Sequence, residues 1–384
     1  MKNILIAIRS IFKKGRHNVM KIVSLGIGLA VGLVLIAKVY FEQSYDDFYP
    51  DRDRVYQVWA KYQQNGGELK DYPQTSGGIA PTMQQQIPEI ETVTRYTSFG
   101  DWTFTMTDTK MKYSGRCIIA DSCFFDILPR PMLIGNAKEV LSTPMYVLIS
   151  SRIAKNIGGD VIGKNFTVDN SPGRTMTIGG VFEEVPENSH SRYDVIVSMA
   201  SAGRFMWEGS PTNMLGNDRY ISYVKLHKGV NPLALEEQVR TFVNSYFPPE
   251  EQQKVGLSID FSFHKLDNLH KELPQVKRMT WILSLLAFAL IFTAVMNYIL
   301  IVISSIVNRS KEVAVHKCYG ASENNIHGMM FGEALVHIVL SLILALLLIL
   351  AFRGTVEELL ATSLDSLLLS NGSLVLLGIC ILVF

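Results

Sequence analysis

A glycine-rich motif is the part of the sequence that comes nearest to a known chemical site. Residues 158–165 read G-x-x-x-x-G-K-N, which differs by one residue from the loop that binds nucleotide phosphates. That loop needs a Ser or Thr hydroxyl to hold Mg²⁺, and the chain has Asn165 in its place. We therefore interpret these glycines as a turn and predict no nucleotide site.

Two further motifs are weaker. Ser262 to Lys265 matches S-x-x-K, but the K-T-G companion of penicillin-binding enzymes does not occur. His264 and His270 flank Asp267 and could bind a metal, although this spacing without Cys partners is more typical of a surface turn. Neither G-x-S-x-G nor H-E-x-x-H occurs. The sequence thus predicts no catalytic residues, no cofactor and no metal site.

The elements that carry these residues follow from hydropathy. Of the 384 residues 18% are charged, below the roughly 25% of soluble domains, and the formal net charge of +1 gives no case for binding nucleic acid. No charged residue lies between 21 and 38 or between 278 and 309, and between 334 and 352 only His337 is ionisable. A helix needs about 20 apolar residues to cross a bilayer. We predict three transmembrane helices, with Lys38 reaching the interface along its apolar stem.

The two ends of the chain need separate interpretation. The first apolar run has a basic start like a signal peptide, but it extends past 15 residues and no A-x-A site follows; this favours a retained anchor. The last run, Ser373 to Phe384, is too short to cross, so we expect the start of a fourth transmembrane helix. Ahead of the first span an apolar helical face predicts an amphipathic helix in the inner leaflet, or else a basic flank that only sets orientation. The residues of that face are Ile4, Leu5, Ile8, Ile11 and Phe12.

Lys and Arg set the expected orientation. Six basic residues precede the first span, and Glu42 is the first acidic residue of the chain. The loop after the second span carries Arg309, Lys311 and Lys317, whereas the loop after the third has Arg353 among three acidic residues. Because basic loops stay in the cytoplasm, we predict a multi-pass protein of the inner (plasma) membrane, with a cytoplasmic N-terminus and a large periplasmic domain.

The fold class expected is a membrane α-helical protein, with four transmembrane helices of which the last is truncated. A large α+β extracytoplasmic domain is inserted between the first and second helices, because short β-rich runs and helical stretches mix there without a βαβ rhythm. The predicted order is a cytoplasmic amphipathic helix over 1–18, transmembrane helices over 19–41, 279–304, 329–352 and 372–384, the outside domain over 42–277, a cytoplasmic segment over 305–327 and an outer loop over 353–371.

Strands and cysteines can be placed within the outside domain. Of the four cysteines, Cys117 and Cys123 lie outside, where they could form a disulfide or be ordinary core residues. Cys318 and Cys380 are expected inside and in the membrane, so neither should be bridged. The β-rich runs are 54–60, 112–120, 176–182, 194–199 and 220–226, and the helical stretches are 81–86, 151–157 and 233–246.

The loop after the second span has a pattern of its own. Apolar residues recur there at helical spacing, Gly320 can end a short helix in the left-handed conformation, and Ser322 can cap the helix that follows. The expected result is a helix, a sharp corner and a long helix at the inner surface. A polar-rimmed protein contact would suit the mixed face of Lys311, Glu312 and Lys317 beside Val313 and Val315. The alternative is a basic loop that only fixes topology, and spacing alone favours it.

Three segments resemble the MacB/FtsX-like permeases of ABC transporters. The loop is similar to their cytoplasmic coupling segment, roughly R-x-x-E-I-x-x-x-x-x-x-G-A-s followed by E-A-l. The segment 45–58, Y-D-D-F-Y-P-D-R-D-R-V-Y-Q-V, resembles the opening of the MacB-type periplasmic core domain, and 178–190, I-G-G-V-F-E-E-V-P-E-N-S-H, resembles a later part of it. The residues that match the coupling pattern are Arg309, Glu312, Gly320, Ala321, Ser322, Glu333 and Ala334.

The resemblance implies partners. Members of the family recruit a separate or fused nucleotide-binding domain, and the resemblance implies that this protein has no ATPase of its own. A separate ABC ATPase subunit is therefore expected to dock under the coupling segment. A second permease copy or a second half, a periplasmic adaptor and membrane lipid are further expected partners. Glu333 near the third span could pair across the helix bundle or face water at the interface. The expected ATPase-coupling residues are Arg309, Lys311, Glu312, Val315, Lys317, Gly320, Ala321 and Ser322.

The function implied is that of a non-catalytic permease subunit. ATP hydrolysis by the partner would move the outside domain, for export or extraction of a lipophilic, peptide or lipoprotein substrate. The alternative is an FtsX-like signalling subunit that activates a cell-wall hydrolase, but the large outside domain favours transport. A membrane-anchored enzyme is a third hypothesis, against which the missing catalytic motifs count. Since the sequence stops at Phe384, the chain could also be the first half of an eight-helix permease.

Overall fold

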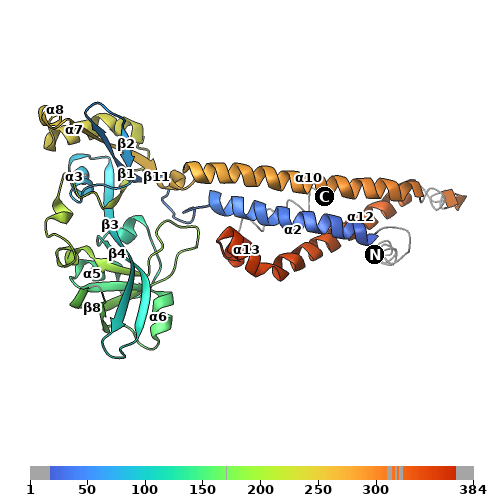
Figure 1. The fold of residues 1–384 in the computed structure, drawn as a ribbon, viewed down its shortest axis with the longest axis horizontal. Coiled ribbons are helices and arrows are strands. Elements are labelled where there is room, and N and C mark those ends of the chain that lie inside the picture. The colour runs from blue at the N-terminus through green and yellow to red at the C-terminus, as the bar shows by residue number, and fades with distance from the viewer. Residues whose placement is uncertain (1–17, 170, 309–313, 316–317, 320–322, 369–384) are drawn as a thin grey trace. The chain divides into compact units, whose positions relative to one another are not determined.

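The computed structural model describes residues 18–169, 171–308, 314–315, 318–319 and 323–368 (Figure 1). The chain divides into two compact units: residues 45–269 form one, and residues 1–44 together with 270–384 form the other. The first is an α+β domain, and the second is helical. The predicted amphipathic helix over 1–18 and the predicted fourth transmembrane helix over 372–384 lie outside the described residues, apart from Asn18.

One mixed sheet organises the α+β domain. In its described part eleven strands follow the order β11-β1-β10-β3-β4-β9-β6-β8-β5, with β2 paired to β1 and β7 paired to β3 and β8. The pairs β4–β9 and β6–β8 are parallel and the others antiparallel. The strands are β1 Val55–Gln64, β2 Lys70–Tyr72, β3 Ile90–Met106, β4 Lys112–Ala120, β5 Met132–Ile134, β6 Tyr146–Ser150, β7 Asn165–Val168, β8 Ser171–Phe182, β9 Val195–Ser198, β10 Ile221–Leu226 and β11 Leu257–Lys265.

Strand β3 joins the two halves of the sheet. It has 17 residues, where strands usually have about 5–6, and its register shifts between Ser98 and Gly100. Gly100 has a φ of 74°, a conformation that glycine adopts without a Cβ clash. Because a bulge bends a strand, the first half of β3 can pair with β10 and the second with β4 and β7.

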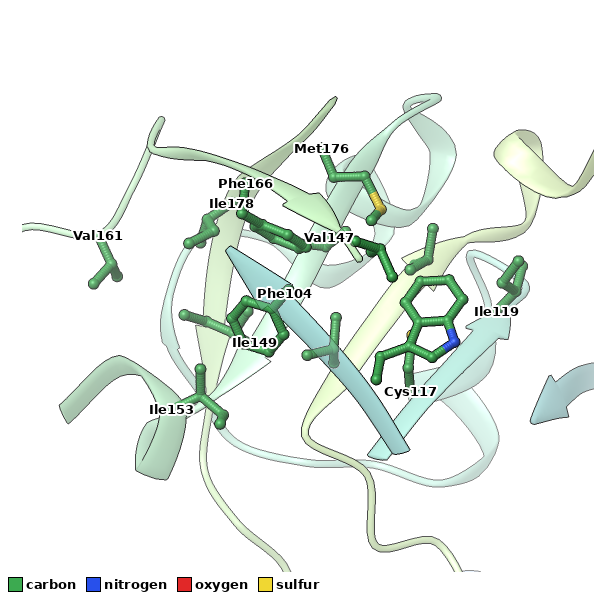
Figure 2. Packing of buried hydrophobic residues seen from close by; sticks show 14 of the residues in the cluster. Phe104, Cys117, Ile119, Val147, Ile149, Ile153, Val161, Phe166, Met176 and Ile178 are labelled. Carbon is green, nitrogen blue, oxygen red and sulfur yellow. The ribbon is translucent and has the colours of Figure 1, made fainter. Parts of the chain in front are cut away.

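The central strands are covered on both faces. Val147, Ile149 and Val195 belong to one apolar cluster, which Figure 2 shows around Phe104, whereas Leu148 belongs to another. Successive side chains of a strand point to opposite faces of the sheet. Because both faces are buried here, these strands need near-continuous apolar sequences. Helices cover the faces: α3 Ile79–Gln86, α4 Phe124–Ile127, α5 Ala137–Ser142, α6 Ser151–Ile157, α7 Glu236–Tyr246, α8 Pro249–Val255 and α9 Leu266–Leu269, with short 3₁₀ turns at Met199–Arg204, Ser210–Thr212 and Pro232–Leu235.

The glycine-rich motif is a turn between α6 and β7. Gly158, Gly159 and Gly163 have φ values of 74°, 65° and 76°, and Asn165 begins β7. Left-handed backbone of this kind favours glycine, which is the interpretation made from the sequence.

The cysteines of the α+β domain are free thiols. Cys117 is buried in the apolar cluster of Figure 2, and the Cys123 Sγ donates to the Val93 carbonyl oxygen at 3.0 Å. Burial raises the pKa of the Cys117 thiol. The sequence left open a disulfide between Cys117 and Cys123 or two ordinary core residues. The structure has no bond between them: Cys117 is a core residue and Cys123 is part-buried.

The helical unit consists of α2 Asn18–Gln43, α10 Pro274–Asn308, α12 Glu323–Ala351, α13 Arg353–Leu360 and α14 Leu364–Leu368. Within the described residues three helices are long and apolar enough to cross a membrane, Asn18–Gln43, Pro274–Ser305 and Ile326–Ala351. Helix α2 packs against both α10 and α12 (Figure 1). The segment predicted as an outer loop contains α13 and α14.

Glycines let these helices approach closely. A Cβ added at Gly28 would lie 2.2 Å from the Ala294 Cβ of α10, and one at Gly32 would lie 2.4 Å from the Ile291 Cγ1. On another side of α2, a Cβ at Gly26 would lie 2.9 Å from the Leu344 Cδ2 of α12. Small residues at such contacts are the usual way for membrane helices to gain packing energy.

Candidate functional site

The predicted ATPase-coupling segment is described only in part. The Tyr319 N–H donates to the Val315 carbonyl oxygen at 3.1 Å, and the exposed fractions of these two residues are 53% and 88%. The other residues predicted for this site lie outside the described part of the chain, so the helix-corner-helix arrangement stays a prediction. They are Arg309, Lys311, Glu312, Lys317, Gly320, Ala321 and Ser322.

Polar side chains form a stripe along α12. Glu333, His337 and Ser341 follow one another at intervals of four residues, which places them on one helix face, and all three are buried. The Ser341 hydroxyl donates to the Ile22 carbonyl oxygen of α2 at 3.1 Å. The His337 ring meets the Tyr298 ring of α10 edge-on at 6.2 Å. Glu333 thus lies on the face of α12 that is turned into the helix bundle.

A second polar group, Lys38, Glu42, His270 and Thr362, lies where the chain leaves α2 and where it returns before α10; we call it the exit cluster. The Lys38 Nζ lies 2.6 Å from the Glu42 Oε1 and donates to the Thr362 hydroxyl at 2.8 Å. The His270 Nε2 lies 2.5 Å from the Glu42 Oε2. Lys38, predicted to reach the interface along its apolar stem, is only 7% exposed because its Nζ is bound by Glu42 and Thr362. The cluster connects α2, the start of α10 and the α13–α14 connection.

A third group anchors the beginning of the α+β domain. Asp46 is 1% exposed and accepts from the Ser189 hydroxyl at 2.7 Å and from the His190 N–H at 3.2 Å. Its own N–H donates to the Asn188 carbonyl oxygen at 2.9 Å. Tyr49, three residues further along the chain, is also buried, and burial raises its pKa. The segments 45–58 and 178–190, which the sequence singled out separately, are therefore in direct contact.

Comparison with known families identifies the chain. The family model described as MacB-like periplasmic core domain matches residues 20–242, and the one described as FtsX-like permease C-terminal matches residues 284–384. The chain belongs to the MacB/FtsX-like family of ABC transporter permeases. This family is the permease component of such transporters and implies an ATPase partner. No curated protein matches the chain at a significant level.

One solved structure supports the fold of the α+β domain, and two others are more distantly similar. The permease is 33% identical to a domain of a protein described as a permease, from Porphyromonas gingivalis, with a TM-score of 0.52, over 56% of this chain and 91% of that one. The periplasmic region of MacB from Actinobacillus actinomycetemcomitans is 15% identical, with a TM-score of 0.37, over 57% of this chain and 91% of that one. The extracellular domain of the noncanonical ABC-type transporter YknZ from Gram-positive bacteria is 11% identical, with a TM-score of 0.38, over 53% and 98%.

The exit cluster bridges the two matched regions of the permease. Lys38 and Glu42 belong to the first match, Thr362 belongs to the second, and His270 lies between them. Sequence reasoning missed this cluster, since nothing in the sequence relates Thr362 to Lys38 across 324 residues. The available signal was weak: two charged residues four apart at the end of an apolar helix, which is the spacing of a helical ion pair.

The residues considered for metal binding are engaged separately. The His264 ring stacks on the Trp59 ring at 4.1 Å, Asp267 pairs with Arg52 at 3.5 Å, and His270 contacts Glu42. In the described part of the permease, no group of three His, Cys, Asp or Glu side chains is placed to hold a metal ion. The contacts of His264, Asp267 and His270 thus connect neighbouring segments of the chain.

Proposed function

We propose that the chain is the permease subunit that couples ATP hydrolysis by a separate ABC ATPase to movement of its own extracytoplasmic domain. Family membership supports the transporter assignment. The observation that carries the coupling is the shortness of both connections. Helix α2 ends at Gln43 and the α+β domain begins at Tyr45, while that domain ends at Leu269 and α10 begins at Pro274. Displacement of either helix would pass to the domain, because the reach of a linker grows with its length and these two connections are short.

The proposed topology follows from charge. The N-terminus and the segment 305–327 face the cytoplasm, where an ATPase can reach them, and the domain over 42–277 faces the periplasm. Four transmembrane helices, with the fourth over 372–384, complete the proposed permease domain. The protein would lie in the inner membrane and act together with a second permease copy or a second half, and with a periplasmic adaptor in the case of export.

The substrate class proposed is lipophilic, peptide or lipoprotein, exported or extracted at the outer face. The FtsX-like signalling alternative is not favoured, because the match over residues 20–242 is to a MacB-like core domain. Glu333 is proposed to pair within the helix bundle, since it is only 7% exposed and an ionisable group inside a membrane needs a partner.

The docking of the ATPase at the coupling segment can be tested by co-purification. Glu312→Lys reverses a charge on the proposed contact face, and Gly320→Pro prevents the left-handed conformation proposed for the corner. The amount of ATPase that co-purifies with each variant should be at least tenfold lower than with the unaltered permease. The ATPase to use is the one encoded nearest to the permease gene. Glu358→Lys is the matched control, because Glu358 is exposed and lies in the proposed outer segment. Full recovery of the ATPase by both coupling variants would contradict the proposal.

A further inference from the structure

A polar cleft of about 340 Å³ in the α+β domain is not used by the proposed coupling mechanism. It lies where β3, β4, α6 and the segment before β9 meet, and four arginines line it: Arg116, Arg130, Arg152 and Arg192. Its volume is within the range of about 300–1,000 Å³ that is usual for small-molecule sites. Four guanidinium groups around one cleft need negative charge nearby to balance them.

The acidic residues of the cleft balance only part of it. The Arg152 Nη2 lies 2.5 Å from the Asp194 Oδ1, and the Arg152 Nε lies 3.8 Å from a Glu184 carboxylate oxygen. The other Asp194 oxygen accepts from the Arg116 backbone N–H at 2.9 Å. Asp101, the third acid, lies opposite Arg116 in the β3–β4 register. Two of the three acids are therefore already bound by Arg152.

The other three arginines of the cleft differ from Arg152. Within the described residues, Arg116, Arg130 and Arg192 form no ion pair. Arg116 and Arg192 are exposed, as the open side of a cleft requires, whereas Arg130 is only 5% exposed. Fixed positive charge in a concave site concentrates anions from solution.

Arg130 is the unusual member of the set. Its Nη2 donates to the Ser191 hydroxyl at 3.2 Å, and Tyr49 also contacts its side chain, but among the described residues Nε and Nη1 have no hydrogen-bond acceptor. Its guanidinium lies over the Phe182 ring at 5.1 Å and over the Tyr193 ring at 5.9 Å. Aromatic faces compensate a buried cation only in part, and burial lowers the pKa of Arg130. Buried donors normally have acceptors, so the unpaired N–H groups of Arg130 favour binding of an added acceptor.

We propose that the cleft binds an oxyanion, a carboxylate or a phosphate, with Arg130 at its base and Arg116 and Arg192 at its mouth. A guanidinium presents a planar fork of N–H groups that matches both anions. Arg152 is already held by Asp194 and keeps the wall in place. Ligand binding here does not depend on the ATPase, so the site and the coupling mechanism can fail independently.

The test uses the full chain in lipid nanodiscs and isothermal titration calorimetry. The probes are sodium phosphate, acetyl-Ala-Ala with a free carboxylate, and the same peptide as its uncharged amide. At least one anion should bind and the amide should not, and which anion binds distinguishes a phosphate source from a peptide end. Affinity should fall as salt is raised, because the exposed arginines are screened.

Variants decide whether the cleft is responsible. Arg116→Gln and Arg192→Gln change exposed side chains, and each should lower the affinity for the anion about tenfold or more. Arg130→Lys keeps the charge but loses the planar fork of N–H groups, and it should lower the affinity to a similar extent. Arg240→Gln is the matched control, since Arg240 is an exposed arginine of the same domain outside the cleft. A melting curve verifies that each variant is folded. Absence of binding by both anions at 10 mM (about ten times a weak dissociation constant of 1 mM), or equal binding by the cleft variants and the control, would overturn the proposal.

Discussion

At the scale of single residues, Asp51 links the segment before β1 to the neighbouring strand β10. Its carboxylate lies 2.6 Å from the Lys225 Nζ and 3.0 Å from the Arg54 Nε, and these two partners hold the pKa of Asp51 below its usual value. A carboxyl whose folded pKa is lowered stabilises the fold above its unfolded pKa, about 4, and the stabilisation is lost as pH falls through the lower folded value.

Asp51→Asn should therefore lower the melting temperature at pH 7 by about 2–4 °C, a modest effect because the carboxylate is about one-third exposed. The difference from the unaltered permease should shrink as the pH is lowered from 5 to 3. Asp53→Asn is the control, since Asp53 is exposed and no ion pair to it occurs in the described structure. A difference that is independent of pH would contradict the assignment of this stabilisation to the carboxylate.

The exit cluster is the residue-scale feature of the helical unit. Lys38→Met would leave Glu42 with only its contact to His270, and breaking a buried ion pair typically costs about 3–5 kcal/mol. The variant should melt at a clearly lower temperature in detergent, and Lys38→Met combined with Glu42→Gln should recover part of the loss, because no unpaired charge then remains. Additive losses in the double variant would show that the two residues do not act as a pair.

At the scale of elements, the close packing of α2 depends on its glycines. Gly28→Leu would place a side chain where Ala294 of α10 already lies, so the helices must separate. We expect a lower melting temperature and a lower yield of folded protein. Gly328→Leu in α12 introduces the same side chain where a Cβ meets nothing within 4 Å, and it should be tolerated. Equal tolerance of the two substitutions would show that this contact is not part of the folded bundle.

Elements were predictable from the sequence to the extent that hydropathy determines them. The three apolar helices, the strand at Lys112–Ala120 and the strand at Ile221–Leu226 follow from composition and alternation. Strand β3 was missed, because Gly100 and Asp101 interrupt its pattern at the point where the bulge lies. The contact of Asp46 with His190 was also out of reach, since 144 residues separate them and only the folded sheet brings them together.

At the scale of the whole molecule, the proposed mechanism needs the α+β domain to follow the helices that enter and leave it. Ten Gly-Ser residues inserted after Gln43 and again after Glu272 would make both connections flexible, with a root-mean-square reach of about 5–6 Å multiplied by the square root of the added length. The ATPase should still co-purify with such a variant, because the coupling segment is unchanged. Movement of the domain in response to nucleotide should be lost.

Hydrogen exchange over residues 45–58 in the assembled complex can measure that movement, with ATP and a hydrolysis-deficient ATPase compared with ADP. In the unaltered permease this segment should change its exchange between the two nucleotides, since it directly follows α2 and is held by Asp46. The doubly extended variant should show no change. The same insertion at the glycine turn between Gly158 and Gly163 controls for added length, and it should leave the response intact because that turn lies on neither connection. A nucleotide response that survives both extended connections would mean that motion reaches the domain by another route, and the coupling proposed from the short connections would then be wrong.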